Sequence, residues 1–343
     1  AMTKMLYATS YSVQLVAHQS AGGALNWQSD GQFVPFLEHA TIVYVVPVIA
    51  HQSGGSAVSE FRTIIKDSNM DISLLPLVPQ VESILHQAGR AIMGYFRQVV
   101  PQQEKSLGDF VTAADLASQE ILIAGLTPLV PQAQVIAEEQ TNPALLNVAQ
   151  HSKQVASYLA DSDYAWVIDP LDGTNNFRHG VARFAISVAL TYQRQTVLGF
   201  IYDPVQRELF YAVKGQGVYR HNGSSVERID PVQRLSTSSD SLHNRLIATN
   251  LKQLIYWPAL VQEGAIWRKF GGAALDLAYV SQGWVDLAGY EGLHWWDWAA
   301  GALLVQEACL QFEQVVVPDG WGGGHRVLAG PPALVQRALA QLS

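Results

Sequence analysis

The stretch that decides the fold is Trp166-Val167-Ile168-Asp169-Pro170-Leu171-Asp172-Gly173-Thr174-Asn175-Asn176-Phe177. The apolar run at its start predicts a buried strand, and Pro170 stiffens the backbone where that run ends. We expect a tight turn there, with Asp169 and Asp172 facing one site from either side. The Leu171 carbonyl would be available between the two carboxylates.

The two residues after these acids could receive an anion. Gly173 would let backbone N–H groups approach a phosphate, and Thr174 would add a hydroxyl. A plain β-turn with an Asp cap is the alternative, because Asp-Gly is common in turns. The motif alone does not separate a turn from a site.

Other acids also close apolar runs, in a chain with only 15% charged residues. Glu138 and Glu139 follow Val135-Ile136-Ala137, and Asp297 follows Trp295-Trp296. We expect each at a strand exit or a helix start, where distant segments converge. Adjacent ionised carboxylates repel one another unless a cation neutralises them, and Mg²⁺ is a hard ion suited to oxygen ligands. The pattern therefore predicts a magnesium site.

Apolar spacing predicts the surrounding helices and strands. A helix is expected from Val81 to Val99, with Pro79 near its start. Thr112 and Asp115 form a capping-box pattern before a second helix over 116–126. Further strands are expected at 135–137, 165–168, 184–190, 197–202 and 208–213, and buried helices at 273–282 and 298–308. Helices, then a meander of strands, then alternation predict layered α and β structure.

Composition limits the class of protein. With 343 residues and 49% hydrophobic side chains, the chain suits about two domains, and disorder is excluded for most of it. Its 29 acids against 21 bases, a net charge of −8, argue against nucleic-acid binding. The tryptophans, Trp295 and Trp298 among them, are expected to pack in the core or at a dimer interface, since no basic residues accompany them.

Cysteine content and apolar runs bear on location. Cys309 stands alone, so it makes no intrachain disulfide, and no Cys/His cluster has zinc spacing. No apolar stretch near the start reaches the roughly 20 residues of a membrane helix, and the first residues lack a signal-peptide pattern. These observations predict a cytoplasmic protein without membrane spans.

Residues 1–69 differ from the rest by few charges and many Gly, Ser, Gln and His residues. Residues 15–23 are echoed at 48–55, and residues 41–46 are β-branched enough for a strand. His18 and His51 could form a metal pair, but ordinary strand-to-turn sequence is the favoured interpretation. No function is predicted for 1–69, and Met70 could be the true start.

Four ordered motifs resemble the inositol monophosphatase family of magnesium-dependent, lithium-sensitive phosphatases. They are 109–115, 137–139, the run 166–177 and 296–301. The resemblance covers about 70–340 and implies an α+β fold, the layered α/β/α/β/α sandwich shared with fructose-1,6-bisphosphatase. It makes 70–343 the catalytic domain, leaves 1–69 as an unassigned extension, and implies a homodimer.

The resemblance implies two or three Mg²⁺ ions per subunit. Glu138, Asp169 and the Leu171 carbonyl would hold the first ion, and Asp169, Asp172 and Asp297 the second. A third, weaker ion would contact Glu138 through waters. Two ions about 4 Å apart can clamp the attacking and leaving oxygens of an in-line displacement.

The resemblance also implies catalytic roles. A water activated by the first ion attacks phosphorus, and its proton moves toward Thr174 and through it to Asp115, with Glu138 part of the same machinery. A plain helix cap is compatible with that role for Asp115. Lys105 matches a family lysine that adds positive charge, although a solvated loop lysine is an equal alternative.

Substrate contacts are implied less directly. Gly271, Gly272 and Ala273 match a stretch whose backbone approaches the substrate ring, and either Tyr290 or Glu291 would contact a hydroxyl. His294 could line the rim, where a histidine is more often incidental. The residues implied to border the substrate are Asp172, Gly173, Thr174, Gly271, Ala273, Glu291 and Asp297.

The expected function is hydrolysis of a small phosphate monoester, inositol 1-phosphate first. Alternatives of the same chemistry are 3′-phosphoadenosine 5′-phosphate, fructose 1,6-bisphosphate and histidinol phosphate. Some bacterial family members bind the transcription machinery, so a regulatory binding protein is the alternative of another class. The intact acid set favours an enzyme, because a bare binding module has no need of five costly carboxylates.

Overall fold

The computed structural model describes residues 42–49, 59–66, 70, 72–106, 109–139, 163–229, 241–250, 264–316 and 324–340. The chain divides into two compact units, Ala1–Ser73 and Leu74–Ser343. In the first unit, β1 (Ile42–Ile49) pairs antiparallel with β2 (Ser59–Lys66), so the strand expected at 41–46 is present. The echoed segment and the His18–His51 alternative lie outside the described residues.

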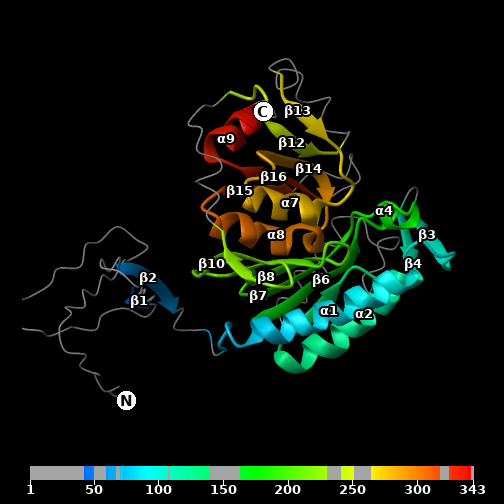
Figure 1. Cartoon of the computed structure of the whole chain (residues 1–343), viewed down its shortest axis with the longest axis horizontal. Coiled ribbons are helices and arrows are strands. Elements are labelled where there is room, and N and C mark those ends of the chain that lie inside the picture. The colour runs from blue at the N-terminus through cyan, green and yellow to red at the C-terminus, as the bar shows by residue number, and fades with distance from the viewer. Residues whose placement is uncertain are drawn as a thin grey trace, which may run out of the picture. The chain divides into compact units, whose positions relative to one another are not determined.

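The second unit alternates helical and sheet layers (Figure 1). Helices α1 (Leu77–Tyr95) and α2 (Ala113–Leu126) cover one face of a seven-stranded sheet. Helices α7 (Ala273–Ser281) and α8 (Trp295–Glu307) lie between that sheet and a five-stranded one. Helix α9 (Pro332–Ala340) covers the far face of the smaller sheet. The expected α/β/α/β/α order is confirmed.

The large sheet is mostly antiparallel, with a parallel pair, β5 and β6, at one edge. Its order is β11 (Val226–Arg228), β10 (Gly217–His221), β9 (Glu208–Val213), β8 (Gln195–Asp203), β7 (Ala185–Tyr192), β6 (Tyr164–Asp172) and β5 (Gln134–Ala137). Because β5 and β6 run in the same direction, the residues that follow them meet at one end of the sheet.

The small sheet and the connecting elements complete the unit. The five-stranded order is β13 (Ile266–Arg268), β12 (Leu246–Thr249), β14 (Leu287–Leu293), β16 (His325–Gly330) and β15 (Gln311–Val316). A ribbon of β3 (Gln102–Ser106) and β4 (Asp109–Thr112), the 3-10 turn η1 (Thr127–Leu129) and the short helix α4 (Thr174–Arg178) connect the layers. In the described part of the chain, no helix combines the length and apolar character that a membrane crossing needs.

The two central helices are apolar on nearly all sides, as a helix packed between two sheets must be. Their small residues allow a very close approach to the large sheet. A Cβ placed on Gly199 of β8 would lie 2.7 Å from the carbonyl oxygen of Ala300 in α8. The small side chains of α8 and the missing side chain at Gly199 together permit this close contact.

Helix α1 ends earlier than its apolar spacing predicts. Tyr95 is its last residue, Phe96 is extended, and Val99 is fully exposed. The Phe96 ring instead packs against Phe184, with ring centroids 4.9 Å apart. The expectation of a helix reaching Val99 was wrong, because this tertiary aromatic contact draws the chain out of the helix.

Strand β6 does not end in the tight turn expected after Ile168. It continues to Asp172 with an irregularity, since Asp169 pairs with Ser187 and Asp172 pairs with Ala185. Three steps along β6 thus match two steps along β7, which is a β-bulge. In a regular strand, residues three apart face opposite sides. The extra residue therefore brings Asp169 and Asp172 to the same face of the sheet.

Candidate metal centre

The predicted acids come together at the end of β5 and β6. Glu138 directly follows β5, and its N–H donates to the Ile168 carbonyl at 3.1 Å. Asp169 and Asp172 lie on the bulged end of β6. Asp297 is the third residue of α8, the helix that packs on this sheet. Four carboxylates from three segments thus come together. Each lies at a strand end or a helix start, as the sequence predicted.

Their electrostatics show that the carboxylates lie close to one another. Burial, then Glu138, Asp172 and Asp297, hold the pKa of Asp169 well above its usual range. Burial, then Glu138 and Asp172, do the same for the pKa of Asp297. The pKa of Asp172 is raised to about 7, mainly by burial. The neighbouring acids make Asp169 and Asp297 harder to ionise, which is the situation a divalent cation relieves.

Lys105 is the positive charge inside this acidic group. Its ammonium nitrogen lies 2.8 Å from Glu138 Oε1 and 2.9 Å from Glu139 Oε1. The side chain is only 9% exposed, so the alternative of a solvated loop lysine is wrong. Burial lowers the pKa of Lys105, but the attraction of both glutamates outweighs burial and raises it overall. One lysine leaves most of the negative charge uncompensated.

Backbone N–H groups bind several of the remaining carboxylate oxygens. Asp172 accepts hydrogen bonds from Ala273 N at 3.3 Å and Ala274 N at 2.8 Å, in the first turn of α7. Asp297 accepts from His294 N at 2.7 Å. Among the described residues, no three His, Cys, Asp or Glu side chains already stand in a metal-ligating arrangement. The donor chemistry, carboxylates with the Leu171 carbonyl oxygen, nevertheless fits a hard divalent cation.

Asp115 and Thr174 form a hydrogen-bonded pair beside the acids. Thr174 Oγ1 lies 3.1 Å from Asp115 Oδ1 and 3.0 Å from the Leu171 carbonyl oxygen. Asp115 also accepts from the backbone N–H and hydroxyl of Thr112, which confirms the capping box of α2. Burial raises its pKa to about 6, against the hydrogen bond from Thr112. A capping carboxylate therefore also faces the Thr174 hydroxyl.

Gly173 fixes the direction in which Thr174 enters α4. Its φ of +91° lies in the left-handed region that favours glycine. A Cβ there would also lie 3.2 Å from the Arg183 carbonyl oxygen. Asn176 holds the same loop from the other side, since its Nδ2 donates to the Arg183 and Phe270 carbonyls at 2.8 Å each. The turn after Asp172 is therefore closely constrained.

The alternatives for a substrate-hydroxyl contact have different partners. The Tyr290 hydroxyl donates to Asp276. Glu291 is buried, and its Oε1 accepts from Arg326 Nε at 2.7 Å and pairs with Nη2. His294 stacks on Trp296 with centroids 4.9 Å apart. Ala273, the first residue of α7, donates to Asp172 through its N–H, and Gly271 lies beside the Asn176 side chain.

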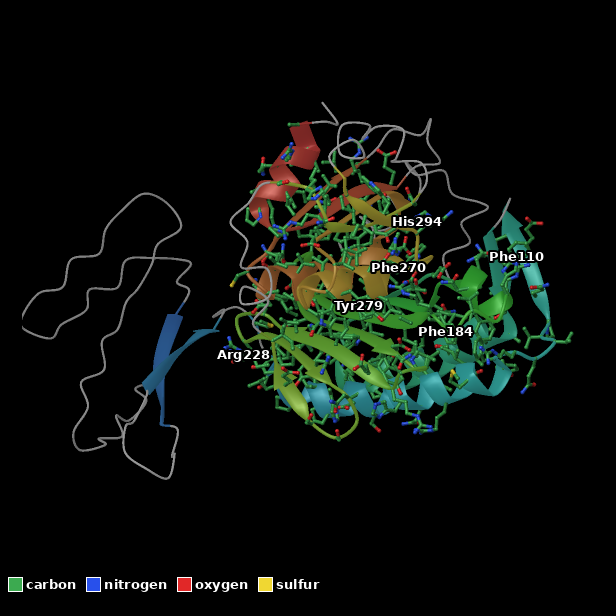
Figure 2. All side chains as sticks on the ribbon, turned by 45° about the horizontal axis from the view of Figure 1, so that its top comes forward. Phe110, Phe184, Arg228, Phe270, Tyr279 and His294 are labelled. Carbon is green, nitrogen blue, oxygen red and sulfur yellow. The ribbon has the colours of Figure 1, made fainter. Side chains whose placement is uncertain are left out.

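Sequence spacing missed one charged network next to the site. Arg183 donates to Asp276, and its guanidinium lies 4.4 Å from the Phe270 ring centroid and 5.2 Å from that of Tyr279. Figure 2 shows Phe270 and Tyr279 in the middle of the unit. Burial raises the pKa of Asp276 to about 6, against the attraction of Arg183. Asp276 is the lone acid in an otherwise apolar helix, a signal that could have singled it out.

Known proteins are similar to this chain in both sequence and fold. The pattern that defines the inositol monophosphatase family matches residues 76–320, which is more than half of the chain. The chain belongs to the inositol monophosphatase family. The matched range contains all of the residues from Lys105 to Asp297 described above.

Individual relatives of the inositol monophosphatase family agree with this assignment. Nus factor SuhB of Salmonella typhimurium is 34% identical over 279 residues, covering 78% of this chain and 96% of that protein. Nus factor SuhB of Escherichia coli is 35% identical over 253 residues, covering 71% and 86%. The extragenic suppressor protein suhB of Bartonella henselae has a solved structure with a TM-score of 0.63 and 28% identity, covering 78% and 98%.

Proposed function

We propose that this protein hydrolyses small phosphate monoesters with Mg²⁺, and that inositol 1-phosphate is its first candidate substrate. The observation that carries the proposal is the cluster of four carboxylates, Glu138, Asp169, Asp172 and Asp297, beside the Asp115–Thr174 pair. Burial and the neighbouring acids of this cluster hold the pKa of Asp169 and Asp297 well above its usual range. Membership of the inositol monophosphatase family supports the same chemistry.

We assign the ligands by the donor groups available. Glu138, Asp169 and the Leu171 carbonyl would hold a first Mg²⁺, and Asp169, Asp172 and Asp297 a second. When bound, Mg²⁺ supplies charge neutralisation at the phosphate and a nucleophile at neutral pH. Phosphate monoesters hydrolyse extremely slowly without help, so the protein's own task is alignment and proton handling.

The Asp115–Thr174 pair suits that proton handling. Thr174 Oγ1 is 3.1 Å from Asp115 Oδ1, within reach for transfer of a proton. Because the pKa of Asp115 is raised to about 6, its carboxylate is both largely ionised and basic enough to accept a proton near neutral pH. We therefore assign Asp115 as the general base acting through the Thr174 hydroxyl.

Phosphate binding would fall to the neighbouring donors. Gly173 and Thr174 begin α4 and present N–H groups that no preceding turn of helix can satisfy. Lys105 keeps its ammonium group at Glu138 and Glu139, where it lowers the negative potential that a phosphate would meet. These residues bind and orient the ester, and Ala273 and Glu291 would border its organic part.

The test is phosphate release from a panel of esters. The panel contains myo-inositol 1-phosphate, 3′-phosphoadenosine 5′-phosphate, fructose 1,6-bisphosphate and histidinol phosphate, with Mg²⁺, with EDTA, and with Mg²⁺ plus Li⁺. Release that needs Mg²⁺ and is fastest for inositol 1-phosphate is the expected result. No release from any ester would defeat the proposal, and a different best ester would change only the substrate.

A second function is favoured by the relatives that carry the description Nus factor SuhB, at 34% and 35% identity. We propose as the alternative that this protein binds the transcription machinery. A pull-down of RNA polymerase with the full chain tests it, with Asp169→Asn alongside. Recovery of polymerase by both proteins, together with no phosphatase activity at millimolar Mg²⁺, would reverse the order of the two proposals.

Three further properties belong to the same proposal; the first two rest on the family resemblance, and the third rests on the single cysteine, Cys309. We propose that Li⁺ inhibits the protein, that it forms a homodimer, and that it acts in the cytoplasm. The Li⁺ arm of the ester panel tests the first of these. Sedimentation of the purified chain tests the second, and cell fractionation tests the third.

A further inference from the structure

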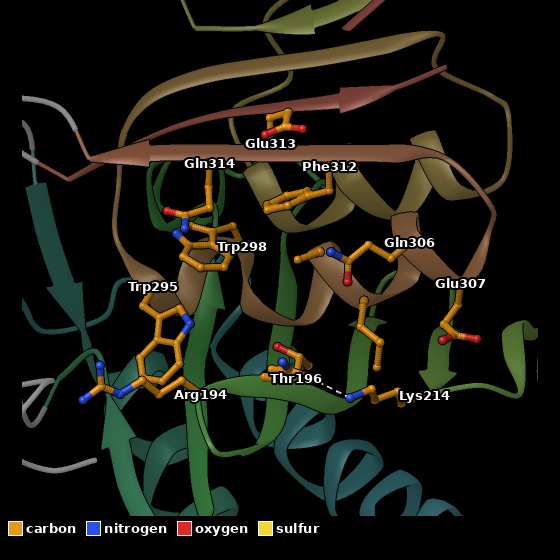
Figure 3. A pocket seen from close by; sticks show the side chains of 13 residues that line it. Arg194, Thr196, Lys214, Trp295, Trp298, Gln306, Glu307, Phe312, Glu313 and Gln314 are labelled. Atoms are coloured by element: carbon orange, nitrogen blue, oxygen red, sulfur yellow. Dashed lines mark hydrogen bonds between the residues drawn. The ribbon is translucent and has the colours of Figure 1, made fainter. Parts of the chain in front are cut away.

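A cavity of about 580 Å³ lies between α8, the β7–β8 turn and β15 (Figure 3). Its volume falls within the roughly 300–1,000 Å³ of typical small-molecule sites. Its lining contains none of the metal-centre residues described above. It is therefore a separate recess on the unit, and its occupant must be argued from its own side chains.

One wall of the cavity is aromatic. Trp295 and Trp298 are three residues apart on α8, so their side chains project from neighbouring positions on one face. Phe312 of β15 packs against Trp298, with ring centroids 5.7 Å apart, and all three line the cavity. Trp298 Nε1 is buried and has no hydrogen-bond acceptor among the described residues. Such a wall favours a flat ring.

Two cations line the same cavity. Arg194 belongs to the β7–β8 turn, and Lys214 follows β9. Lys214 donates to the neutral Gln195 side chain at 2.7 Å. Neither cation takes part in an ion pair of the described residues. Figure 3 shows Arg194 next to Trp295, so a positive charge stands beside the aromatic wall.

The two acids of the lining are already bound within the protein. Glu307 accepts from Gly215 N and Gly217 N, one with each oxygen, at 2.7 Å each. Glu313 accepts from Gln311 Nε2 at 2.8 Å. The lining therefore holds its acids with internal donors while Arg194 has no described anionic partner. An entering anion would supply that partner.

We propose that this cavity binds a planar aromatic ring that carries an anionic group. The ring would pack on the aromatic wall, and the anion would bind Arg194 beside Trp295. The proposal goes beyond phosphate-ester hydrolysis and does not depend on it. Because α8 also carries Asp297, the ligand would contact the helix that supplies an acid to the metal centre.

The test is isothermal titration of the full chain with 1-naphthoate and with 1-naphthamide, in EDTA. The two probes share one ring system and differ in charge, and EDTA removes metals that could bind the carboxylate. Naphthoate is expected to bind one to one and about tenfold more tightly than naphthamide. Arg194→Gln is expected to remove that advantage and leave naphthamide unchanged, whereas Trp298→Leu weakens both probes.

Arg207→Gln is the matched control. Arg207 also has a positive φ, 57° against 68° for Arg194, and lies in another hairpin turn, but it does not line the cavity. It is expected to leave both affinities unchanged. Equal affinities for the two probes, equal effects of the two arginine substitutions, or no binding of naphthoate at millimolar concentration would each overturn the proposal.

Discussion

At the scale of single residues, the acids of the metal centre differ in what holds them. Asp169, Asp172 and Asp297 accept from backbone N–H groups, whereas Glu138 is paired with Lys105. Asp169 is 2% exposed and lies among all three of the other acids. Its charge is the one that a neighbouring cation would affect most, so it is the position where substitution is most informative.

Asp169→Asn is expected to abolish turnover and weaken Mg²⁺ binding, because it removes the carboxylate proposed to bridge both ions. The same change removes a repulsive charge, so the melting temperature in EDTA should rise or stay constant. Phosphate release and thermal melts measure the two effects. Asp163→Asn, at an exposed position just before β6, is the control. Near-normal hydrolysis by Asp169→Asn would sink the ligand scheme.

Lys105→Met is expected to destabilise the protein by about 3 kcal/mol in EDTA, because it leaves two mostly buried glutamates without their cation. Added Mg²⁺ should restore part of that loss by taking over the neutralisation. Urea denaturation with and without Mg²⁺ measures the difference. Lys269→Met, at an exposed position, should change little, and an equal loss with and without Mg²⁺ would contradict the prediction.

At the scale of elements, local signals were predictable from sequence and contacts between elements were not. The capping box at Thr112 and Asp115 is contained in four adjacent residues. The end of α1 depends on Phe96 meeting Phe184. The bulge depends on how β7 pairs with β6, which the sequence of β6 alone does not contain. The spacing of Asp169 and Asp172 therefore predicted a turn in place of a bulge.

The contact between β8 and α8 gives an element-scale prediction. Gly199→Ala is expected to lower stability by about 1–3 kcal/mol, because the new Cβ meets the Ala300 carbonyl and neither backbone can move easily. Gly94→Ala in α1 is the matched control, since nothing lies within 4 Å of its Cβ. It should stabilise the helix by about 0.5–1 kcal/mol. Thermal melts compare the two variants, and equal effects would contradict the packing argument.

At the scale of the whole molecule, ordered motifs predicted the layers and the acids that meet. They did not predict which partner each side chain takes. Asp172 accepts a hydrogen bond from the start of α7, about a hundred residues away. Arg326 of β16 donates to the carboxylate of Glu291 in β14. The first contact joins two layers, and the second joins neighbouring strands of one sheet. Both depend on how distant elements pack or pair, which residue spacing does not encode.

The buried acids also predict how stability depends on pH. Burial raises the pKa of Asp115 and Asp276 to about 6, and of Glu139 and Asp172 to about 7. The unfolded chain has ordinary acids with pKa about 4, so the folded state binds more protons between these values. Stability without metal should therefore rise as pH falls from about 8 to about 6.

Thermal melts in EDTA across that range test the prediction. Mg²⁺ should remove most of the rise, because it stabilises the ionised carboxylates. Burial lowers the pKa of His325, so protonation of this histidine in the unfolded chain lowers stability as the pH falls. This effect is opposite to that of the acids and acts only toward the lower end of the range. A melting temperature that falls as the EDTA sample is acidified from pH 8 to pH 6 would contradict the prediction.

The bulge in β6 has a consequence for mutational scanning. In a regular ladder, each backbone carbonyl is occupied by the neighbouring strand on one side or the other. Here Pro170 O accepts from Ser118 Oγ at 2.8 Å, and Leu171 O accepts from Thr174 Oγ1 at 3.0 Å. The irregular pairing has turned two main-chain oxygens toward side chains. In an alanine scan, Leu171→Ala would report only the loss of a buried side chain, because the main-chain oxygen stays in place. Deleting one residue of the bulge would remove such an oxygen, which no side-chain substitution can do.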